Sequence, residues 1–413
     1  MLDEQKYQFY AAINVAFTPG APINSRDLFA GRTKQVDRVI ITIFQRGQHV
    51  VLFGERGVGK TSLANTLFDF LVMAGKANYG FARVQCSETM TFEDIWRSIF
   101  RHFTYEFEEQ TYTVDQYLPE KPNSENVRET FALVSMPTII VIDEMDRIKS
   151  PETQTALADT IKTLSDNSID TTLIMVGVAD ALDQLIREHR SIDRAIVQVP
   201  MPRMSKNELL EIVDKGMTKC GLTVEGSVRE RLADYSQGLP SYTHLLAREA
   251  ALAAVRSDKT NITMDDLHMA IREAVDSQLG TSLTAYNTAI SAPRGKNFKP
   301  VLLACALATK DEKGFFYATH VTQPLRLITG KAYEIPAFAR HLKDFCDSSR
   351  GPILERDKRK YRFIKPLMEP YVVLRGLADG LIDEKQLSRP AATSTEPEQL
   401  LLLSVSAPLA SRK

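Results

Sequence analysis

The stretch HVVLFGERGVGKTS (residues 49–62) decides the fold. His49–Phe53 is a short apolar run that predicts a buried strand, and the pattern of residues 60–75 predicts a helix. The segment between them, Gly54–Thr61, matches the pattern GxxxxGK[ST]. Glycines let backbone amides surround a phosphate without steric conflict, and the helix N-terminus adds positive potential. The sequence therefore predicts a phosphate-binding loop.

This pattern gives each residue type a task. Lys60 should reach the β- and γ-phosphates of a nucleoside triphosphate, and Thr61 should ligate Mg²⁺. A chance glycine-rich turn is the alternative, and the matching strand and helix disfavour it. The predicted nucleotide-binding residues of the loop are Gly54, Glu55, Arg56, Gly57, Val58, Gly59, Lys60, Thr61 and Ser62.

A second acidic element completes the predicted site. Thr138–Ile142 is the most apolar strand of the chain, and Asp143 and Glu144 follow it directly. Ligands of open α/β sheets bind at this carboxyl end. We expect Asp143 to hold Mg²⁺ through water and Glu144 to act as the general base for hydrolysis. Taken alone, two solvated acids at a strand end would be the better interpretation, but they follow a phosphate loop.

Alternating strands and helices predict an α/β fold with a parallel sheet covered on both faces. Residues 108–130 are expected to form a surface insertion, and residues 1–32 an irregular leader. The predicted strands and helices of this part are 33–46, 49–53, 60–75, 79–86, 91–107, 138–142, 152–166, 172–178 and 195–199.

The pattern changes after Pro200. Four helices are expected, then a linker over 281–299, then a unit of three helices and two strands, and a tail that is disordered from 385 onward. The predicted elements are 205–219, 226–236, 241–256, 264–279, 300–309, 321–328, 336–347, 353–355 and 361–364. The predicted domains are a leader (1–32), a nucleotide-binding core (33–203), a helical lid (204–280), a C-terminal domain (281–376) and a tail (377–413).

A phosphate loop, an acidic strand end and an all-helical lid resemble the AAA+ superfamily over roughly residues 25–280. Within it the chain resembles the initiator clade, the origin-recognition ATPases and their homologues. The resemblance implies ATP or ADP with Mg²⁺, an ATPase activity, a C-terminal winged helix that binds duplex DNA, and a homo-oligomer or a partner effector protein. It also implies that Arg32, in Phe29-Ala30-Gly31-Arg32, contacts the adenine side of the nucleotide. An arginine finger is implied before the last strand, at Arg194 by position, with Arg190 as the second candidate. A surface salt bridge is the alternative role for Arg194.

Two positions depart from the initiator pattern. Asp180 stands where the first sensor has a polar asparagine, and Ser241 stands where the second sensor has an arginine. The lid segment Gly238-Leu239-Pro240-Ser241 resembles the Gly-x-Pro of STAND signalling NTPases, which implies that Pro240 contacts the nucleotide. His244, one turn further, is expected either to approach a phosphate or to pack in the lid.

Charge is distributed unevenly along the chain. Residues 281–376 contain 17 lysines and arginines against 8 acids, a charge of +9, which leaves −10 for the rest of a chain with net charge −1. Helix 336–347 is the expected recognition helix, with exposed Arg340, His341 and Lys343. The alternative is a basic module that binds protein or nothing. The expected wing cations are Arg356, Lys358, Arg359, Lys360 and Arg362.

Composition excludes several classes. The apolar fraction of 44% is that of a globular protein, and the four cysteines lie far apart, which predicts free thiols. No apolar run reaches the roughly 18 residues of a membrane span, and no signal peptide is recognisable, so we expect a cytoplasmic protein without membrane contact. Three functions stay open: an initiator-like, DNA-binding ATPase, a STAND-like switch in signalling or anti-phage defence, and an ATP-dependent regulator of a transposition or recombination partner.

Overall fold

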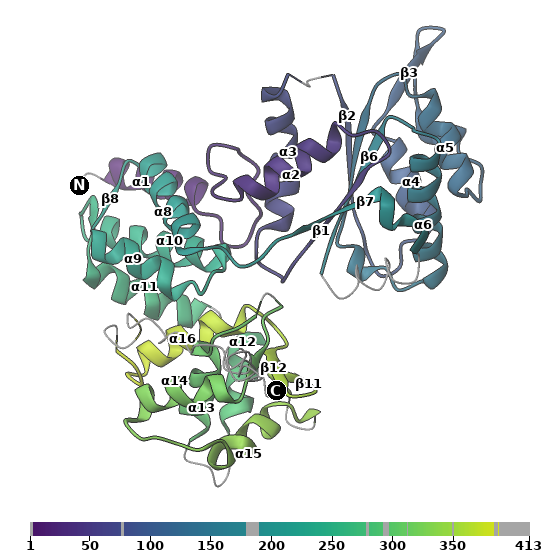
Figure 1. Cartoon of the computed structure of the whole chain (residues 1–413). Helices are drawn as coiled ribbons and strands as arrows, with labels where there is room; N and C mark the ends of the chain where they lie inside the picture. The colour runs from purple at the N-terminus through teal and green to yellow at the C-terminus, as the bar shows by residue number, and fades with distance from the viewer. Residues whose placement is uncertain are drawn as a thin grey trace, which may run out of the picture.

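The computed structural model describes residues 3–75, 78–178, 190–277, 281–291, 297–311, 313–348, 351–383 and 387. Figure 1 shows a sheet with helices on both faces on the right, a helical body on the left, and a C-terminal domain below them. None of the described helices is both long and apolar enough to cross a membrane. All four cysteines are free thiols, as predicted.

Five parallel strands form the central sheet in the order β2-β5-β6-β1-β7. The predicted parallel sheet is confirmed. β1 lies between β6 and β7, with Val51 opposite Met175 on one side and Gln198 on the other. Its strands are β1 (His49–Phe53), β2 (Gly80–Gln85), β5 (Thr138–Asp143), β6 (Thr171–Gly177) and β7 (Ile196–Pro200).

The two faces of the sheet are buried under different helices. Side chains alternate along a strand, so Val50 and Leu52 face one layer while Val51 faces the other. Helices α2 (Thr33–Ile43) and α3 (Lys60–Met73) cover the first face. The second face is covered by α4 (Phe92–Phe100), α5 (Ser124–Leu133) and α6 (Pro151–Asp166).

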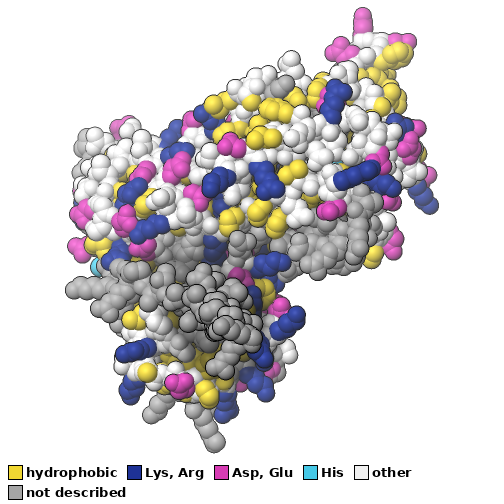
Figure 2. Space-filling model, in the orientation of Figure 1, with side chains coloured by type: hydrophobic (Ala, Val, Ile, Leu, Met, Phe, Trp, Pro, Cys, Tyr) yellow, Lys and Arg dark blue, Asp and Glu magenta, His cyan; other side chains and the backbone are white. Residues whose placement is uncertain are grey.

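The predicted helix over 91–107 is wrong for its last seven residues. α4 ends at Phe100, and the chain continues as a hairpin of β3 (Thr104–Phe107) and β4 (Gln110–Thr113), followed by the short helix η1 (Val114–Tyr117). Glu108 and Glu109 both have positive φ, 49° and 62°, which is the geometry of a tight hairpin turn. The hairpin stands out from the body, with acidic side chains at its tip (Figures 1 and 2).

The four predicted lid helices are present, each within two residues of its expected bounds. A capping box starts the first of them, where the Ser205 hydroxyl and the Glu208 carboxylate bond each other's backbone amides. Two short parallel strands, β8 (Thr223–Val224) and β9 (Asn261–Ile262), add to the lid and were too short to predict. The lid helices are α8 (Lys206–Cys220), α9 (Gly226–Tyr235), α10 (Pro240–Arg256) and α11 (Met264–Ser277).

The expectation of an irregular leader is wrong for its first half, because α1 (Asp3–Ala16) is a helix. Ile13, Ala16 and Phe17 are buried against α8 and α10 of the lid. Tertiary burial therefore stabilises a helix whose sequence alone has little amphipathic pattern. The contact is tight at Gly216, where an added Cβ would lie 2.2 Å from the Phe17 ring.

The C-terminal domain contains the predicted helices and strands, and three further elements. Residues 281–290 form α12 instead of the predicted linker, because Tyr286 is buried and its ring packs against Tyr371. Pro293 and Gly295, within the predicted linker, and almost all of the tail lie outside the described residues. The elements are α12 (Thr281–Ile290), α13 (Phe298–Leu307), β10 (Phe316–Tyr317), α14 (Thr319–Thr329), α15 (Ile335–Phe345), β11 (Leu354–Asp357), β12 (Lys360–Phe363) and α16 (Met368–Ala378).

The three strands of this domain form an antiparallel sheet in the order β10-β12-β11. One continuous apolar cluster runs from α1 through the lid into the C-terminal domain. The sheet has its own clusters on its two faces. Burial therefore joins the lid and the C-terminal domain more closely than it joins either of them to the sheet.

The Phe17–Gly216 contact leads to a test of the leader helix. Gly→Ala inside a helix ordinarily stabilises by up to about 1 kcal/mol. Gly216→Ala should instead lower the melting temperature, because overpacking against Phe17 costs about 1–3 kcal/mol. Gly226→Ala, at the start of α9 with open space around it, is the control and should not lower it. Equal melting temperatures for the two variants would contradict the packing of Phe17 on α8.

Candidate nucleotide site

The loop between β1 and α3 has the backbone that its glycines predicted. Gly57 and Gly59 have φ values of +87° and +94°, which side chains rarely adopt. At Gly54 an added Cβ would lie 2.3 Å from the carbonyl oxygen of Met201, after β7. These three positions therefore require glycine for conformation or for close approach.

The ammonium of Lys60 lies inside the loop. Its Nζ donates to the carbonyl oxygens of Gly54 and Glu55, at 2.8 and 2.7 Å. Burial lowers the pKa of Lys60 to about 8 because the charged form is desolvated. A phosphate at this position would offer the ammonium an anionic partner in place of two neutral carbonyls.

Thr61 and Asp143 converge at the end of β5. The Thr61 hydroxyl donates to Oδ2 of Asp143 at 3.1 Å, and Arg83 of β2 donates to the same oxygen at 2.6 Å. Oδ1 accepts from the backbone amide of Glu144 at 2.8 Å. One hydroxyl and one carboxylate fit Mg²⁺, which takes few protein ligands and completes its shell with water and phosphate oxygens. Thr61 and Asp143 would hold the ion.

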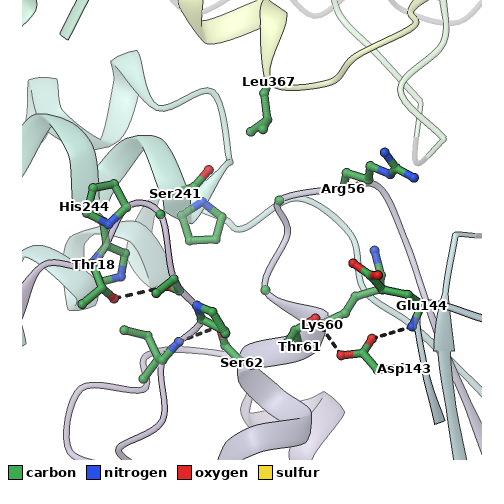
Figure 3. A pocket seen from close by; sticks show the side chains of 18 of the residues that line it. Thr18, Arg56, Lys60, Thr61, Ser62, Asp143, Glu144, Ser241, His244 and Leu367 are labelled. Atoms are coloured by element: carbon green, nitrogen blue, oxygen red, sulfur yellow. Dashed lines mark hydrogen bonds between the residues drawn. The ribbon is translucent and has the colours of Figure 1, made fainter. Parts of the chain in front are cut away.

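Glu144 follows at a strained backbone position. Its φ is +56°, in the left-handed region that non-glycine residues rarely occupy. Its carboxylate accepts a hydrogen bond from Arg147 at 3.1 Å and is 40% exposed. The strained turn places the carboxylate beside Asp143 and Lys60 at the cavity (Figure 3).

A cavity of about 730 Å³ joins these groups. Its walls come from the leader segment 18–30, the phosphate loop, the end of β5, the start of α10 in the lid, and Leu367 of the C-terminal domain (Figure 3). The size suits a nucleotide-sized ligand. The predicted site residues that line it are Arg56, Gly57, Gly59, Lys60, Thr61, Ser62, Asp143, Glu144 and Pro240.

The lid contributes neutral groups to this cavity. Pro240 and Ser241 begin α10, and His244 lies one turn further. His244 is buried, accepts a hydrogen bond from the Thr18 amide at 3.4 Å, and packs on the Phe17 ring. Burial lowers the pKa of His244 to about 4, so the imidazole is neutral at pH 7. This geometry favours the packing role for His244 over a phosphate contact.

Four described residues that were predicted to bind the nucleotide do not line the cavity: Arg32, Gly54, Glu55 and Val58. Arg32 is buried behind the loop, where its guanidinium donates to the carbonyl oxygens of Val58 and Pro202 at 2.8 and 2.7 Å. Arg32 therefore braces the loop from behind. The carboxylate of Glu55 turns away toward Arg203, and Gly54 contacts Met201.

The candidates for the first sensor and the arginine finger are Asp180, Arg190 and Arg194. Asp180 and the side chain of Arg190 lie outside the described residues. Arg194 lies just before β7, is exposed, and pairs with Asp166 of α6. Its role as a finger for a neighbouring subunit stays a prediction.

Sequence reasoning missed several residues of the site. Arg83 holds Asp143, Arg147 holds Glu144, and residues 18–30 form one wall. No local motif marks them, since each reaches the site only through the folded arrangement. For Arg83 the available signal in the sequence was its charge, which is unusual within a strand of the sheet.

The predicted DNA-contacting residues lie on α15 and on the β11–β12 hairpin. Arg340 and Lys343 are exposed on α15, whereas His341 is half-buried against the Phe298 ring, which corrects the expectation that it is exposed. In the hairpin, Lys360 pairs with Asp311 at 2.8 Å and Arg362 pairs with Glu355. The exposed cations of the hairpin are Arg356, Lys358 and Arg359.

Part of the chain is similar to a known protein family. Residues 43–186 match a family model described as "AAA domain". This segment is therefore similar to an AAA domain. The AAA+ fold that the sequence predicted is therefore confirmed, with the parallel sheet, the phosphate loop and the acidic strand end in their expected places. Among curated proteins, no sequence matches the chain.

Several solved structures are similar to this chain. The Walker-type ATPase paby2304 of Pyrococcus abyssi is 14% identical, with 86% of this chain and 98% of that chain covered and a TM-score of 0.53. Cdc6p from Pyrobaculum aerophilum is 15% identical, covering 90% and 99%, with a TM-score of 0.47. ORC1 of Aeropyrum pernix, solved in complex with DNA, is 15% identical, covering 90% and 98%, with a TM-score of 0.48. The likeness to the Pyrococcus protein shows a shared fold.

The buried ammonium of Lys60 generates a pH prediction. A phosphate requires the charged form, and the pKa of Lys60 in the free protein is about 8. ATP affinity should therefore be nearly constant from pH 7 to 8 and fall above pH 8, by up to about tenfold per pH unit. Lys60→Arg keeps its charge at all these pH values and should give a flat profile. Calorimetric titration between pH 7 and 9.5 checks this, and parallel profiles for both proteins would contradict it.

Proposed function

We propose that this AAA+ protein binds ATP·Mg²⁺, hydrolyses it, and couples the nucleotide state to duplex DNA binding through its C-terminal domain. The convergence of Lys60, Thr61, Asp143 and Glu144 on one cavity between the sheet and the lid carries the proposal. A cation, a hydroxyl, a metal-binding carboxylate and a second carboxylate are the groups that phosphoryl transfer to water requires.

Each group has a separate task in this proposal. Lys60 neutralises the β- and γ-phosphates, and Mg²⁺ held by Thr61 and Asp143 supplies further positive charge to the phosphate oxygens. Glu144 accepts the proton of the attacking water. Its hydrogen bond to Arg147 uses Oε2, so Oε1 can accept that proton without breaking this bond.

Substitutions of Lys60 and Glu144 separate binding from hydrolysis. Lys60→Ala should abolish ATP binding, because it removes the cation of the loop. Glu144→Gln should retain binding and lower the hydrolysis rate by about 10²- to 10⁴-fold, because it removes the base and leaves Asp143 in place.

Phosphate release and equilibrium binding of labelled ATP measure the two effects. Glu152→Gln, an exposed acid at the start of α6, is the matched control and should behave as wild type. Unchanged nucleotide affinity in Lys60→Ala would overturn the site, and wild-type turnover in Glu144→Gln would remove Glu144 as the base.

The C-terminal domain supports the DNA part of the proposal. Three helices, α13 to α15, precede an antiparallel hairpin, the order of elements in a winged helix. On the face that Figure 2 shows, several Lys and Arg side chains lie at the edges of this lower part of the molecule, beside a few acidic ones. Arg340 and Lys343 on α15 would face a groove, and the exposed cations Arg356, Lys358 and Arg359 of the hairpin would lie on phosphates.

A salt titration tests this domain. If the three exposed hairpin cations each neutralise one phosphate, they contribute about −2.7 to the slope of log affinity against log salt. Changing Arg356, Lys358 and Arg359 together to Ala should flatten the slope by about that amount for every duplex sequence.

The control for that titration removes three exposed cations elsewhere, Lys34, Lys162 and Lys219, which changes the net charge equally. Its slope should match wild type. Equal slopes for the hairpin variant and wild type, or no duplex binding at any salt, would exclude the hairpin as a DNA contact.

A second candidate function is a STAND-like nucleotide switch that holds its nucleotide and turns over slowly. The cavity supports it, because the lid lines it with Pro240, Ser241 and His244 and, among the described lid residues, with no arginine. Copurified ADP with slow turnover would favour this switch, whereas rapid cycling of ATP would favour the initiator-like function.

A further inference from the structure

The C-terminal domain reaches the phosphate loop through Leu367, which lies between β12 and α16. Its Cδ2 is 3.0 Å from the position that a Cβ on Gly57 would occupy, and its side chain points toward the cavity (Figure 3). Its carbonyl oxygen accepts a hydrogen bond from the Tyr242 hydroxyl of α10 at 2.8 Å. Leu367 therefore touches the loop and the lid together at the mouth of the cavity.

A chain of four charges lies beside this contact. Arg203, which follows β7, donates from Nε to Glu55 of the phosphate loop at 2.9 Å. The same guanidinium forms two hydrogen bonds to Glu369 of α16, at 2.9 and 2.7 Å. Lys310, after α13, pairs with Glu369 at 2.5 Å. Glu369 is 2% exposed and Lys310 is 9% exposed, so the chain is largely removed from water.

Two of the four charges come from the nucleotide-binding core and two from the C-terminal domain. Glu55 and Arg203 belong to the nucleotide-binding core, and Glu369 and Lys310 belong to the C-terminal domain. Burial alone would lower the pKa of Arg203, but the charges of Glu369 and Glu55 outweigh burial and raise it. If the two sides separate, each retains a neutral pair, so no buried charge is left without a partner.

The apolar packing also separates the C-terminal domain from the sheet. The lid and the C-terminal domain share one buried cluster that includes Leu246 of α10 and Tyr371 of α16. Among the described residues, no buried apolar cluster contains members of both the sheet and the C-terminal domain. The C-terminal domain thus meets the nucleotide-binding core at the Arg203–Glu369 ion pair, at Leu367, and at Gly314 beside Glu55. It meets the lid through a shared apolar core.

We propose that the C-terminal domain is a releasable cover of the phosphate loop, with Arg203 as the positioning residue that clamps Glu55, and that docking of the cover slows nucleotide exchange. This inference rests on the proposed nucleotide site. Leu367 narrows the mouth over Gly57, and the clamp on Glu55 keeps the loop beneath it. Linkage is reciprocal, so a nucleotide state that favours docking of the C-terminal domain on the loop is itself stabilised by that docking. The cover therefore couples the cavity to the domain that carries the basic hairpin.

The test measures dissociation of methylanthraniloyl-ADP from the full chain by stopped flow, after addition of excess ADP. Leu367→Ala shortens a side chain that is 38% exposed and therefore tests the cover with little risk to folding. The double variant Glu369→Gln/Lys310→Met removes one neutral pair without stranding a charge. Both should release the labelled ADP at least about fivefold faster, the low end of ordinary coupling between sites.

Two further variants separate positioning from general damage. Arg203→Met should also accelerate release, and Arg203→Lys should restore part of the wild-type rate because it keeps the charge but not the two parallel hydrogen bonds. Lys299→Met is the matched control, because Lys299 pairs with Asp379 in the same domain and Asp379 keeps Arg375 as a partner. Its release rate should equal wild type.

The outcomes distinguish this inference from the site on which it rests. If wild type fails to bind the labelled ADP, the nucleotide site itself is wrong. If wild type binds it, but Leu367→Ala and the double variant release it at the wild-type rate, the cover is wrong and the site stands. Acceleration in Lys299→Met equal to that of the double variant would also overturn the cover.

Discussion

The strands of the sheet all point one way, and this constraint places every reacting group of the molecule. Parallel strands end at one edge, so the glycine loop after β1, the carboxylates after β5 and the return of the chain after β7 meet there. The close approach of Gly54 to the Met201 carbonyl is the local expression of the same constraint. The lid and the C-terminal domain both attach beyond β7, and so both come to rest beside this edge.

Each charged group of the proposed site at this edge bonds a neighbour within the chain. Lys60 bonds two carbonyls, Asp143 bonds Arg83, and Glu144 bonds Arg147. Each group that the proposed chemistry needs already has a hydrogen-bond partner within the chain. A phosphate, a cation or a water could replace that partner. The pairs Glu55–Arg203 and Glu369–Lys310 extend this arrangement to the C-terminal domain.

The sequence was sufficient wherever function follows local spacing, and insufficient where it follows long-range packing. The glycine loop, Lys60, Thr61, Asp143 and Glu144 lie at fixed intervals beside apolar strands, so the core of the site could be predicted. Arg32 could not be placed, because its role depends on the Pro202 carbonyl, far along the chain. The same reason explains Arg83, Arg203 and the leader wall. α12 was mistaken for a linker, since its stability comes from burial of Tyr286.

The position of the leader also affects how the chain must fold during synthesis. α1 is made before its packing partners α8 and α10, and Thr18 bonds a histidine 226 residues downstream. At ribosomal speeds this interval is roughly 10 to 45 s. During this interval the residues of α1 that the lid buries have no native partner. The nascent chain therefore exposes an apolar segment until the lid emerges. Chaperone capture of that segment would therefore be expected to precede closure of the cavity.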